Sequence, residues 1–151
     1  MGPEGFTQGG LRVKLSIELP VQFRDIDRMG HVNHAVYLQY METARVELAR
    51  RLGMIRDVSS SSFIVAMAHC EYKKPIRDEQ RVTVSCWVSR IGDRSWDLDY
   101  TVSAGRVEFA RGRTTQVGYD YETRSTVRIS EKLRKSLGKY AGKSLRFREI
   151  P

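Results

Sequence analysis

Residues 34–53 read HAVYLQYMETARVELARRLG, and their periodicity is the strongest structural signal in the chain. Apolar residues recur at spacings of three and four, which predicts a long amphipathic helix. Asn33 is expected to cap this helix and Gly53 to end it. The apolar stripe comprises Tyr37, Met41, Ala44, Leu48 and Leu52, and Ala35, Leu38 and Val46 widen it. An apolar surface this broad predicts that other structure wraps around the helix.

Several segments on either side of this helix alternate between apolar and polar residues, which indicates half-buried β-strands. Before the helix, a strand is expected over residues 13–19, with residues 21–24 continuing it as a bent or edge strand beyond Pro20. After the helix, strands are expected over residues 63–72, 82–88, 96–102 and 107–121, with a short one near 126–129. Gly92 and Asp93 predict a hairpin turn, and Ser130 is expected to begin a basic helix. This order of elements predicts an α+β fold.

The length and composition favour one folded domain. The chain has 151 residues, of which 40% are hydrophobic, enough for a core without disulfides or metal. Residues 1–10 contain four glycines and a proline and are expected to form a flexible tail, leaving residues 11–151 as the domain. The longest apolar run, residues 63–68, is far shorter than the roughly 20 residues of a membrane span. With no secretory signal pattern either, we expect a cytoplasmic protein without membrane contact.

The net charge of +8 favours an anionic partner. Nucleic acids, phosphorylated cofactors and anionic membranes all satisfy this condition, so charge alone does not choose among them. Aromatic residues are not interleaved with basic ones, as surfaces that stack on nucleic-acid bases require. A nucleic-acid partner is therefore not favoured.

Residue types that carry chemistry are densest just before the helix. This cluster comprises Asp25, Asp27, His31, Asn33 and His34. The first amides of a helix lack intrahelical partners and carry partial positive charge. If Asn33 caps the helix, the amides of residues 34–36 are candidates to hold the oxyanion that develops in acyl transfer. A carboxylate upstream would then act as a nucleophile or general base.

The same cluster has two other interpretations. Asp and Asn before a helix commonly form only a cap or an Asx-turn, and Gly30 commonly supplies only a turn. The aspartates and histidines are also metal-ligand types, but their spacing matches no established zinc or facial-triad pattern. We therefore expect no metal site.

The segment FRDIDRMGHVNHAVYLQYMETAR, residues 23–45, resembles the signature of hotdog-fold acyl-CoA thioesterases of the 4-hydroxybenzoyl-CoA thioesterase family. The resemblance continues through HCEYKKPIRDEQRVTV, residues 69–84, and VGYDYETRS, residues 117–125. It implies a hotdog fold, in which a curved antiparallel sheet wraps around a long central helix. It also implies homodimers with active sites at the subunit interface, commonly paired into homotetramers. The implied sheet order separates Cys70 from Cys86, so both are expected to be free thiols.

The resemblance also assigns roles to individual residues. The catalytic carboxylate of the family falls at Asp27, as nucleophile or general base, while Asp25 takes a structural position. The residue whose backbone amide polarises the thioester carbonyl falls at His34, and its side chain could also orient water or substrate. The supporting positions of the motif are Gly30, His31, Asn33, Tyr37, Glu42 and Arg45.

Glu42 and the basic residues each have two interpretations. Another hotdog thioesterase branch uses a carboxylate from the central helix, but for Glu42 we favour a pair with Arg45 one turn later. Lysine and arginine side chains suit the phosphates of coenzyme A. The candidates are Lys73, Lys74, Lys132 and Arg134, with a solvated charged face as the alternative.

Taken together, the sequence predicts an acyl-CoA thioesterase that hydrolyses an acyl or aroyl thioester to a free acid and coenzyme A. Neither a metal nor a redox cofactor is implied, and coenzyme A enters only as part of the substrate. One rival is a hotdog hydratase or dehydratase, whose relatives carry different motifs. Another rival is a non-catalytic hotdog protein that binds acyl thioesters or nucleic acid. The apolar strand at residues 63–72 is expected to form the dimer, as the corresponding strand does in relatives.

Overall fold

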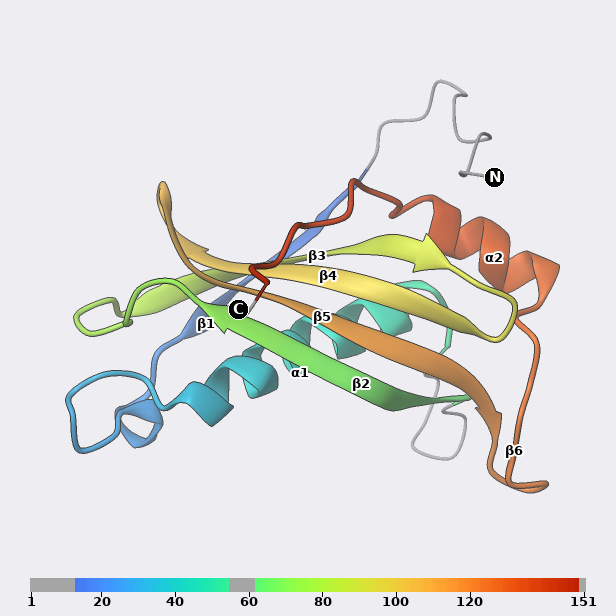
Figure 1. Cartoon of the computed structure of the whole chain (residues 1–151), viewed down its shortest axis with the longest axis horizontal. Coiled ribbons are helices and arrows are strands. Elements are labelled where there is room, and N and C mark those ends of the chain that lie inside the picture. Colours follow the sequence, from blue (N-terminus) through green and yellow to red (C-terminus); the bar gives the residue numbers. More distant parts are fainter. Residues whose placement is uncertain (1–12, 55–61, 150–151) are drawn as a thin grey trace.

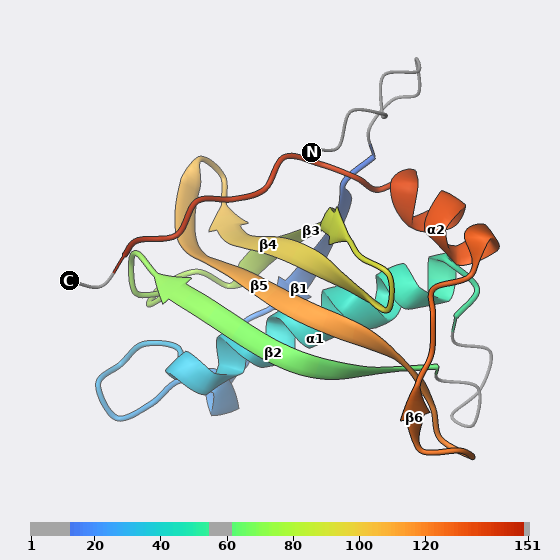
Figure 2. The same cartoon turned by 45° about the vertical axis from the view of Figure 1, so that its right-hand side comes forward.

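The computed structural model describes residues 13–54 and 62–149, so the expected tail at residues 1–10 lies outside the described residues. Six strands form one antiparallel sheet in the order β1-β3-β4-β5-β2, with β6 beside β5. The strands are β1 (Leu15–Pro20), β2 (Phe63–Tyr72), β3 (Arg81–Ile91), β4 (Ser95–Ala104), β5 (Val107–Asp120) and β6 (Ser125–Thr126). The helices are η1 (Phe23–Asp25, a 3-10 turn), α1 (His34–Arg51) and α2 (Glu131–Gly138). The predicted α+β class is confirmed, and the sheet curves over α1 (Figures 1 and 2).

Helix α1 forms the centre of the core, as its periodicity predicted. Met41, Ala44 and Leu48 are buried against the sheet. Residue 112 on β5 is glycine, and a Cβ there would lie 2.5 Å from the Met41 methyl carbon and 2.9 Å from the His69 carbonyl oxygen. The absence of a side chain at Gly112 therefore allows α1 to approach the sheet closely.

The predicted ends of α1 are confirmed, but its predicted burial is only partly right. The Asn33 Oδ1 accepts a hydrogen bond of 2.9 Å from the Ala35 amide, and Gly53 adopts a φ of +71° just beyond the helix. Ala35 and Leu38, however, are exposed, because the sheet of one chain covers only one side of the helix. A single copy of the chain therefore does not surround α1 on all sides.

Most predicted strands form where expected, and two do not. Residues 63–72 are β2, and β3 and β4 form the predicted hairpin around Gly92 and Asp93. Residues 21–24 do not continue β1, because the Asp25 carboxylate accepts a hydrogen bond from the Gln22 amide and closes the η1 turn. The strand expected near 126–129 is reduced to β6, because the Ile129 amide donates instead to the Asp93 carbonyl as the chain turns toward α2.

The strand order places β1 and β2 at the two edges of the main sheet. Cys70 on β2 and Cys86 on β3 are consequently separated by β5 and β4, and both are free, as predicted. Burial raises the pKa of the Cys86 thiol, which keeps it protonated. Within residues 13–54 and 62–149, no helix combines the length and the hydropathy needed to cross a membrane.

The basic helix α2 begins after Ser130, as predicted, and is followed by an extended segment that the sequence did not reveal. Residues 139–149, here called the C-terminal strap, cross the sheet on the face opposite α1 (Figures 1 and 2). The strap donates backbone hydrogen bonds from Gly142 to the Val88 carbonyl on β3 and from Arg148 to the Glu71 carboxylate on β2. It therefore connects strands that are far apart in the sheet.

Asp99 on β4 joins the strap to the sheet. This fully buried carboxylate receives two hydrogen bonds from Arg113, at 2.7 and 2.9 Å, and one of 2.7 Å from the backbone amide of Leu145 in the strap. Ser89 donates a further hydrogen bond to it. A buried carboxylate requires such partners, since an unpaired one would be strongly destabilising.

We predict that Asp99→Asn lowers the free energy of unfolding by about 2–3 kcal/mol, because it leaves Arg113 without its partner charge. This corresponds to a fall in Tm of roughly 4–12 °C. Asp78→Asn, at an exposed position, serves as the control and should change stability by less than about 0.5 kcal/mol. Thermal unfolding by circular dichroism compares the two variants. Equal Tm values for both variants would contradict the role given to Asp99.

Candidate functional site

A tight loop carries the predicted catalytic residues to the start of α1. Ile26 and Val32 form an antiparallel bridge, and between them the Asp27 amide donates to the His31 carbonyl at 2.9 Å. Gly30, with a φ of +79°, donates its amide to the Asp27 carbonyl. We call residues 25–34 the active-site loop. Its hydrogen bonds fix Asp27 close to the helix N-terminus.

Asp25 anchors the active-site loop to the core. Its buried carboxylate accepts hydrogen bonds from the Gln22 amide at 2.8 Å and from the Tyr40 hydroxyl at 3.0 Å. Its carbonyl accepts from the Asn33 amide at 2.8 Å. Burial, reinforced by the bond to Asp25, raises the pKa of the Tyr40 phenol, so the hydroxyl stays protonated and can donate. With these contacts, Asp25 stabilises the loop and is not available to a substrate.

Asp27 is the aspartate of this pair that remains accessible. Its Oδ1 accepts a hydrogen bond of 2.9 Å from the Met29 amide, and its side chain is 18% exposed. The Oδ2 lies 3.5 Å from the Nδ1 atom of His31. One carboxylate oxygen is thus oriented by the backbone while the other faces an imidazole at the surface.

The amides at the start of α1 are not equally available. The Ala35 amide donates to the Asn33 side chain and the Val36 amide to the Asn33 carbonyl. The His34 amide has no hydrogen-bond acceptor among the residues that the structure describes. Of the three amides considered from the sequence, His34 therefore supplies the donor that an oxyanion could use.

An aromatic wall borders this amide, and sequence reasoning missed its outermost member, Tyr72. The Tyr72 hydroxyl donates a hydrogen bond of 2.7 Å to the His34 carbonyl, and its ring packs edge-on against Tyr37 with centroids 5.0 Å apart. Burial raises the pKa of both phenols. Tyr72 ends β2, whereas Tyr37 lies one turn into α1, so only the fold brings them together. The one available signal for Tyr72 was that it lies in residues 69–84, the second segment that resembles the thioesterase family.

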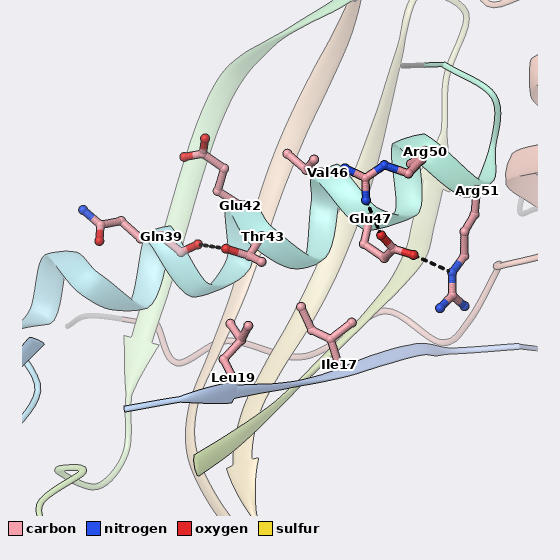
Figure 3. Close-up of a pocket in the computed structure, with 9 residues that line it drawn as sticks. All are labelled: Ile17, Leu19, Gln39, Glu42, Thr43, Val46, Glu47, Arg50 and Arg51. Carbon is pink, nitrogen blue, oxygen red and sulfur yellow. Dashed lines mark hydrogen bonds and ion pairs between the residues drawn. The ribbon is translucent and has the colours of Figure 1, made fainter. Parts of the chain in front are cut away.

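Glu42 lies away from the active-site loop, in an open groove of about 690 Å³ between α1 and β1. Figure 3 shows Ile17 and Leu19 pointing from β1 toward α1, while Glu42 points away from β1. In the described part of the chain, no ion pair joins Glu42 to Arg45, and Arg45 instead lines an interior pocket. The groove lacks the active-site loop, so it is not the centre of the candidate chemistry.

The four predicted coenzyme A contacts divide into two groups. Lys73 and Lys74 follow the end of β2, where the Lys73 Nζ lies 3.8 Å from Glu108. Lys132 is exposed on α2, and Arg134 donates a hydrogen bond of 2.9 Å to the Gly92 carbonyl. Figure 1 shows α2 and the end of β2 at opposite ends of the sheet. One chain therefore does not gather these side chains into a single phosphate site.

The geometry supports acyl transfer better than metal chemistry. Among the residues described, no three histidine, cysteine, aspartate or glutamate side chains converge as metal ligands. Asp25 is bonded to Tyr40 and the backbone, whereas Asp27 and His31 are half-buried and the Asp27 side chain remains 18% exposed. A carboxylate on the same loop as a helix N-terminal amide can attack a carbonyl, or activate water, while the amide stabilises the oxyanion.

Comparisons with known proteins point the same way. The sequence model of the thioesterase-like superfamily matches residues 21–137. The chain is 24% identical over 83 residues to the uncharacterised protein YsmA of Bacillus subtilis (strain 168), and the match covers 55% of this chain and 56% of YsmA. The chain thus spans about half the length of that relative.

Solved structures share the fold. A predicted thioesterase from Bacillus stearothermophilus superposes with a TM-score of 0.83 at 19% identity, covering 87% of this chain and 99% of that one. A thioesterase from Thermus thermophilus, complexed with coenzyme A and zinc, has a TM-score of 0.72 at 30% identity, covering 81% of this chain and 90% of that one. These similarities confirm the hotdog fold expected from the sequence.

Proposed function

Because the chain belongs to the thioesterase-like superfamily, we propose that it is an acyl-CoA thioesterase that hydrolyses an acyl or aroyl thioester to a free acid and coenzyme A. The observation that carries the proposal is the Asp27 carboxylate on the same tight loop as the His34 amide, which has no acceptor among the described residues. The coenzyme A held by the Thermus relative supports a coenzyme A thioester as substrate. The narrower assignment to the 4-hydroxybenzoyl-CoA thioesterase family rests on the motif at residues 23–45.

In the proposed reaction, the thioester carbonyl oxygen accepts a hydrogen bond from the His34 amide. The partial positive charge of the α1 N-terminus then stabilises the oxyanion as the carbonyl carbon becomes tetrahedral. Asp27 either takes a proton from an attacking water molecule or attacks that carbon itself, in which case a mixed anhydride forms and water hydrolyses it to the free acid after coenzyme A has left. When the carbon–sulfur bond breaks, the thiolate of coenzyme A leaves and takes up a proton. The proposed steps call for neither a metal nor a redox cofactor.

We further propose that the active protein is a homodimer, formed along β2 and itself paired into a homotetramer. Strand β2 is an edge of the sheet, and unpaired edges bind other strands readily. Around it, Val65, Met67 and Leu38 are 42%, 40% and 39% exposed, so apolar surface borders the edge. A second copy along β2 would cover this surface and would lie beside Tyr72 and His34. The cytoplasmic location expected from the sequence also remains a proposal.

We predict that Asp27→Asn lowers kcat for the best acyl-CoA substrate at least about a hundredfold, since an amide is neither a base nor a nucleophile. The Asn side chain can still accept the Met29 amide bond, so Tm and oligomeric state should be nearly unchanged. Release of coenzyme A, followed with a thiol reagent across a panel of acyl-CoA thioesters, measures the effect.

Glu42→Gln is the matched control for Asp27→Asn, because it neutralises the exposed carboxylate of the central helix and should retain near wild-type kcat. The reverse result, an active Asp27→Asn enzyme and an inactive Glu42→Gln enzyme, would transfer the catalytic role to Glu42. If no thioester in the panel is hydrolysed by the wild-type enzyme, the proposed function is wrong.

We also predict that the purified protein sediments at micromolar concentration as a dimer or tetramer, with a mass of two or four times 17.4 kDa. Sedimentation velocity measured alongside the hydrolysis rate tests whether the site is shared between subunits. A stable monomer of 17.4 kDa with full activity would show that one chain is sufficient.

A further inference from the structure

The positive charge of the chain is concentrated in one late segment. Residues 128–149 contain eight basic and two acidic residues, so they carry +6 of the net charge of +8. Two of the basic side chains are paired, because Arg128 lies 3.5 Å from Asp93 and Arg134 lies 4.0 Å from Glu131. The other six have no carboxylate within 4 Å in the described part of the chain. We call these six the basic face: Lys132, Lys135, Lys139, Lys143, Arg146 and Arg148.

Helix α2 contributes three of these side chains from one of its sides. Lys132, Lys135 and Lys139 follow spacings of three and four and are exposed, so they line one side of the helix and its C-cap. On the other side, Leu137 is fully buried and Leu133 packs against the core. The helix is therefore packed on the sheet with its lysines directed away from it.

The C-terminal strap contributes the other three cations. Leu145 and Phe147 are half-buried and alternate with Arg146 and Arg148, which are exposed, as expected for an extended chain on a surface. The Phe147 ring packs edge-on against His69 of β2, with ring centroids 4.8 Å apart. The apolar side chains of the strap thus face the sheet, and its arginines face outward.

Side chains of the sheet hold the backbone of the strap. The indole nitrogen of Trp87 donates a hydrogen bond of 2.9 Å to the Lys143 carbonyl, and Arg111 donates one of 3.0 Å to the Arg146 carbonyl. The Lys14 ammonium lies 4.3 Å from the centroid of the same Trp87 ring, so it adds a seventh cation beside the strap. Because the fold bonds the strap through its backbone, the charged side chains of the strap are available to a partner.

The basic face is broad and lacks exposed apolar residues. Figures 1 and 2 show α2 and the strap on the same side of the sheet, opposite α1. The strap runs from β3 to β2, which are separated by three interstrand distances, or about 14 Å. In the described part of the chain, no large apolar side chain is exposed on α2 or the strap. The cations therefore spread over a surface and do not follow a single track.

These properties favour one class of anionic partner. Protein interfaces have an apolar or aromatic centre, and nucleic-acid single strands stack on free aromatic rings. The basic face offers neither, since Phe147 and Trp87 are packed within the fold. A nucleic-acid duplex presents its phosphates along a rod, and a second copy would set like charges against each other. An anionic bilayer presents phosphates over a plane and attracts basic residues without apolar insertion.

We propose that the basic face docks the protein peripherally on an anionic lipid bilayer. The active-site loop leads into α1 on the other side of the sheet, so docking leaves it open to solvent (Figures 1 and 2). The sequence-based expectation of no membrane contact rested on the lack of a span and of a signal pattern, and a peripheral contact requires neither. The proposal goes beyond the thioesterase function and does not depend on it, because docking involves no thioester.

A dimer formed along β2 would reinforce this docking. Two copies of one strand that pair antiparallel are related by a two-fold axis perpendicular to the sheet. Both basic faces then lie on the same side of the joined sheet, whatever the register of the pairing. Two linked faces bind one surface more tightly than either does alone.

Cosedimentation with lipid vesicles tests the docking. The full chain is mixed with vesicles of equal parts phosphatidylglycerol and phosphatidylcholine, or of phosphatidylcholine alone, at physiological ionic strength and without any thioester. Partition into the anionic vesicles should be at least about a hundredfold stronger, since each basic residue near such a surface contributes. Added salt should release the protein, because it screens the attraction.

Paired variants locate the contact. Arg146→Gln combined with Arg148→Gln should weaken binding to the anionic vesicles about 25-fold, because each basic residue changes the partition coefficient about fivefold. The matched control, Arg50→Gln combined with Arg51→Gln, removes the same charge from α1 and should bind within about threefold of the wild type. The strap variant keeps the backbone bonds of residues 146 and 148, so its Tm should be nearly unchanged.

Four results would overturn the proposal. The first is equal binding to both kinds of vesicle, and the second is binding to neither. The third is an equal loss in the two double variants, which would show that net charge acts without a defined face. The fourth is a duplex oligonucleotide that binds more tightly than the anionic vesicles at the same phosphate concentration, which would make nucleic acid the partner. Each of them leaves the thioesterase function standing, because hydrolysis is measured separately.

Discussion

The close packing of α1 against β5 at Gly112 is the contact on which the rest of the structure depends. Met41 occupies the space that a side chain at residue 112 would need. This contact sets the depth of the helix in the curved sheet, because Ala44 and Leu48, which are also buried, follow on the same face. His34 begins the helix seven residues before Met41, so the same contact also sets where its amide lies relative to Tyr72.

The two aspartates of the active-site loop divide structure and chemistry between them. Asp25 ties the loop to Tyr40 and thus to the same helix, while Asp27 stays partly exposed beside His31. The helix supplies a hydrogen-bond donor for the substrate carbonyl through the His34 backbone amide. Asn33 bonds the Ala35 and Val36 amides and does not bond this one. The Asp27 carboxylate and the His34 amide lie on the same loop, which is why the proposed activity rests on one loop and one helix end.

Periodicity was sufficient to predict α1 and the β3–β4 hairpin, because their apolar residues recur at helical and at alternate spacing, and the apolar run at residues 63–68 indicated β2. It failed at residues 21–24, where the Asp25 side chain bonds the backbone and creates a turn. The C-terminal strap was not predicted because its apolar residues follow no regular spacing. Side chains of the sheet bond its backbone instead. The placement of Asp27 follows from a local motif. The position of Tyr72 depends on contacts between distant elements, so no local pattern could predict its place beside His34.

The central claim is that the His34 amide stabilises the oxyanion, and a proline at this position tests it directly. His34 is the first helical residue, where proline is well tolerated, and Asn33 has the extended backbone (φ −57°, ψ 137°) that proline prefers before it. His34→Pro removes the amide hydrogen together with the side chain, whereas His34→Ala removes only the side chain. The decisive measurement is kcat for acyl-CoA hydrolysis by the two folded variants. We predict that the proline variant is about 10²–10³-fold slower than the alanine variant. Equal rates for the two variants would contradict the account.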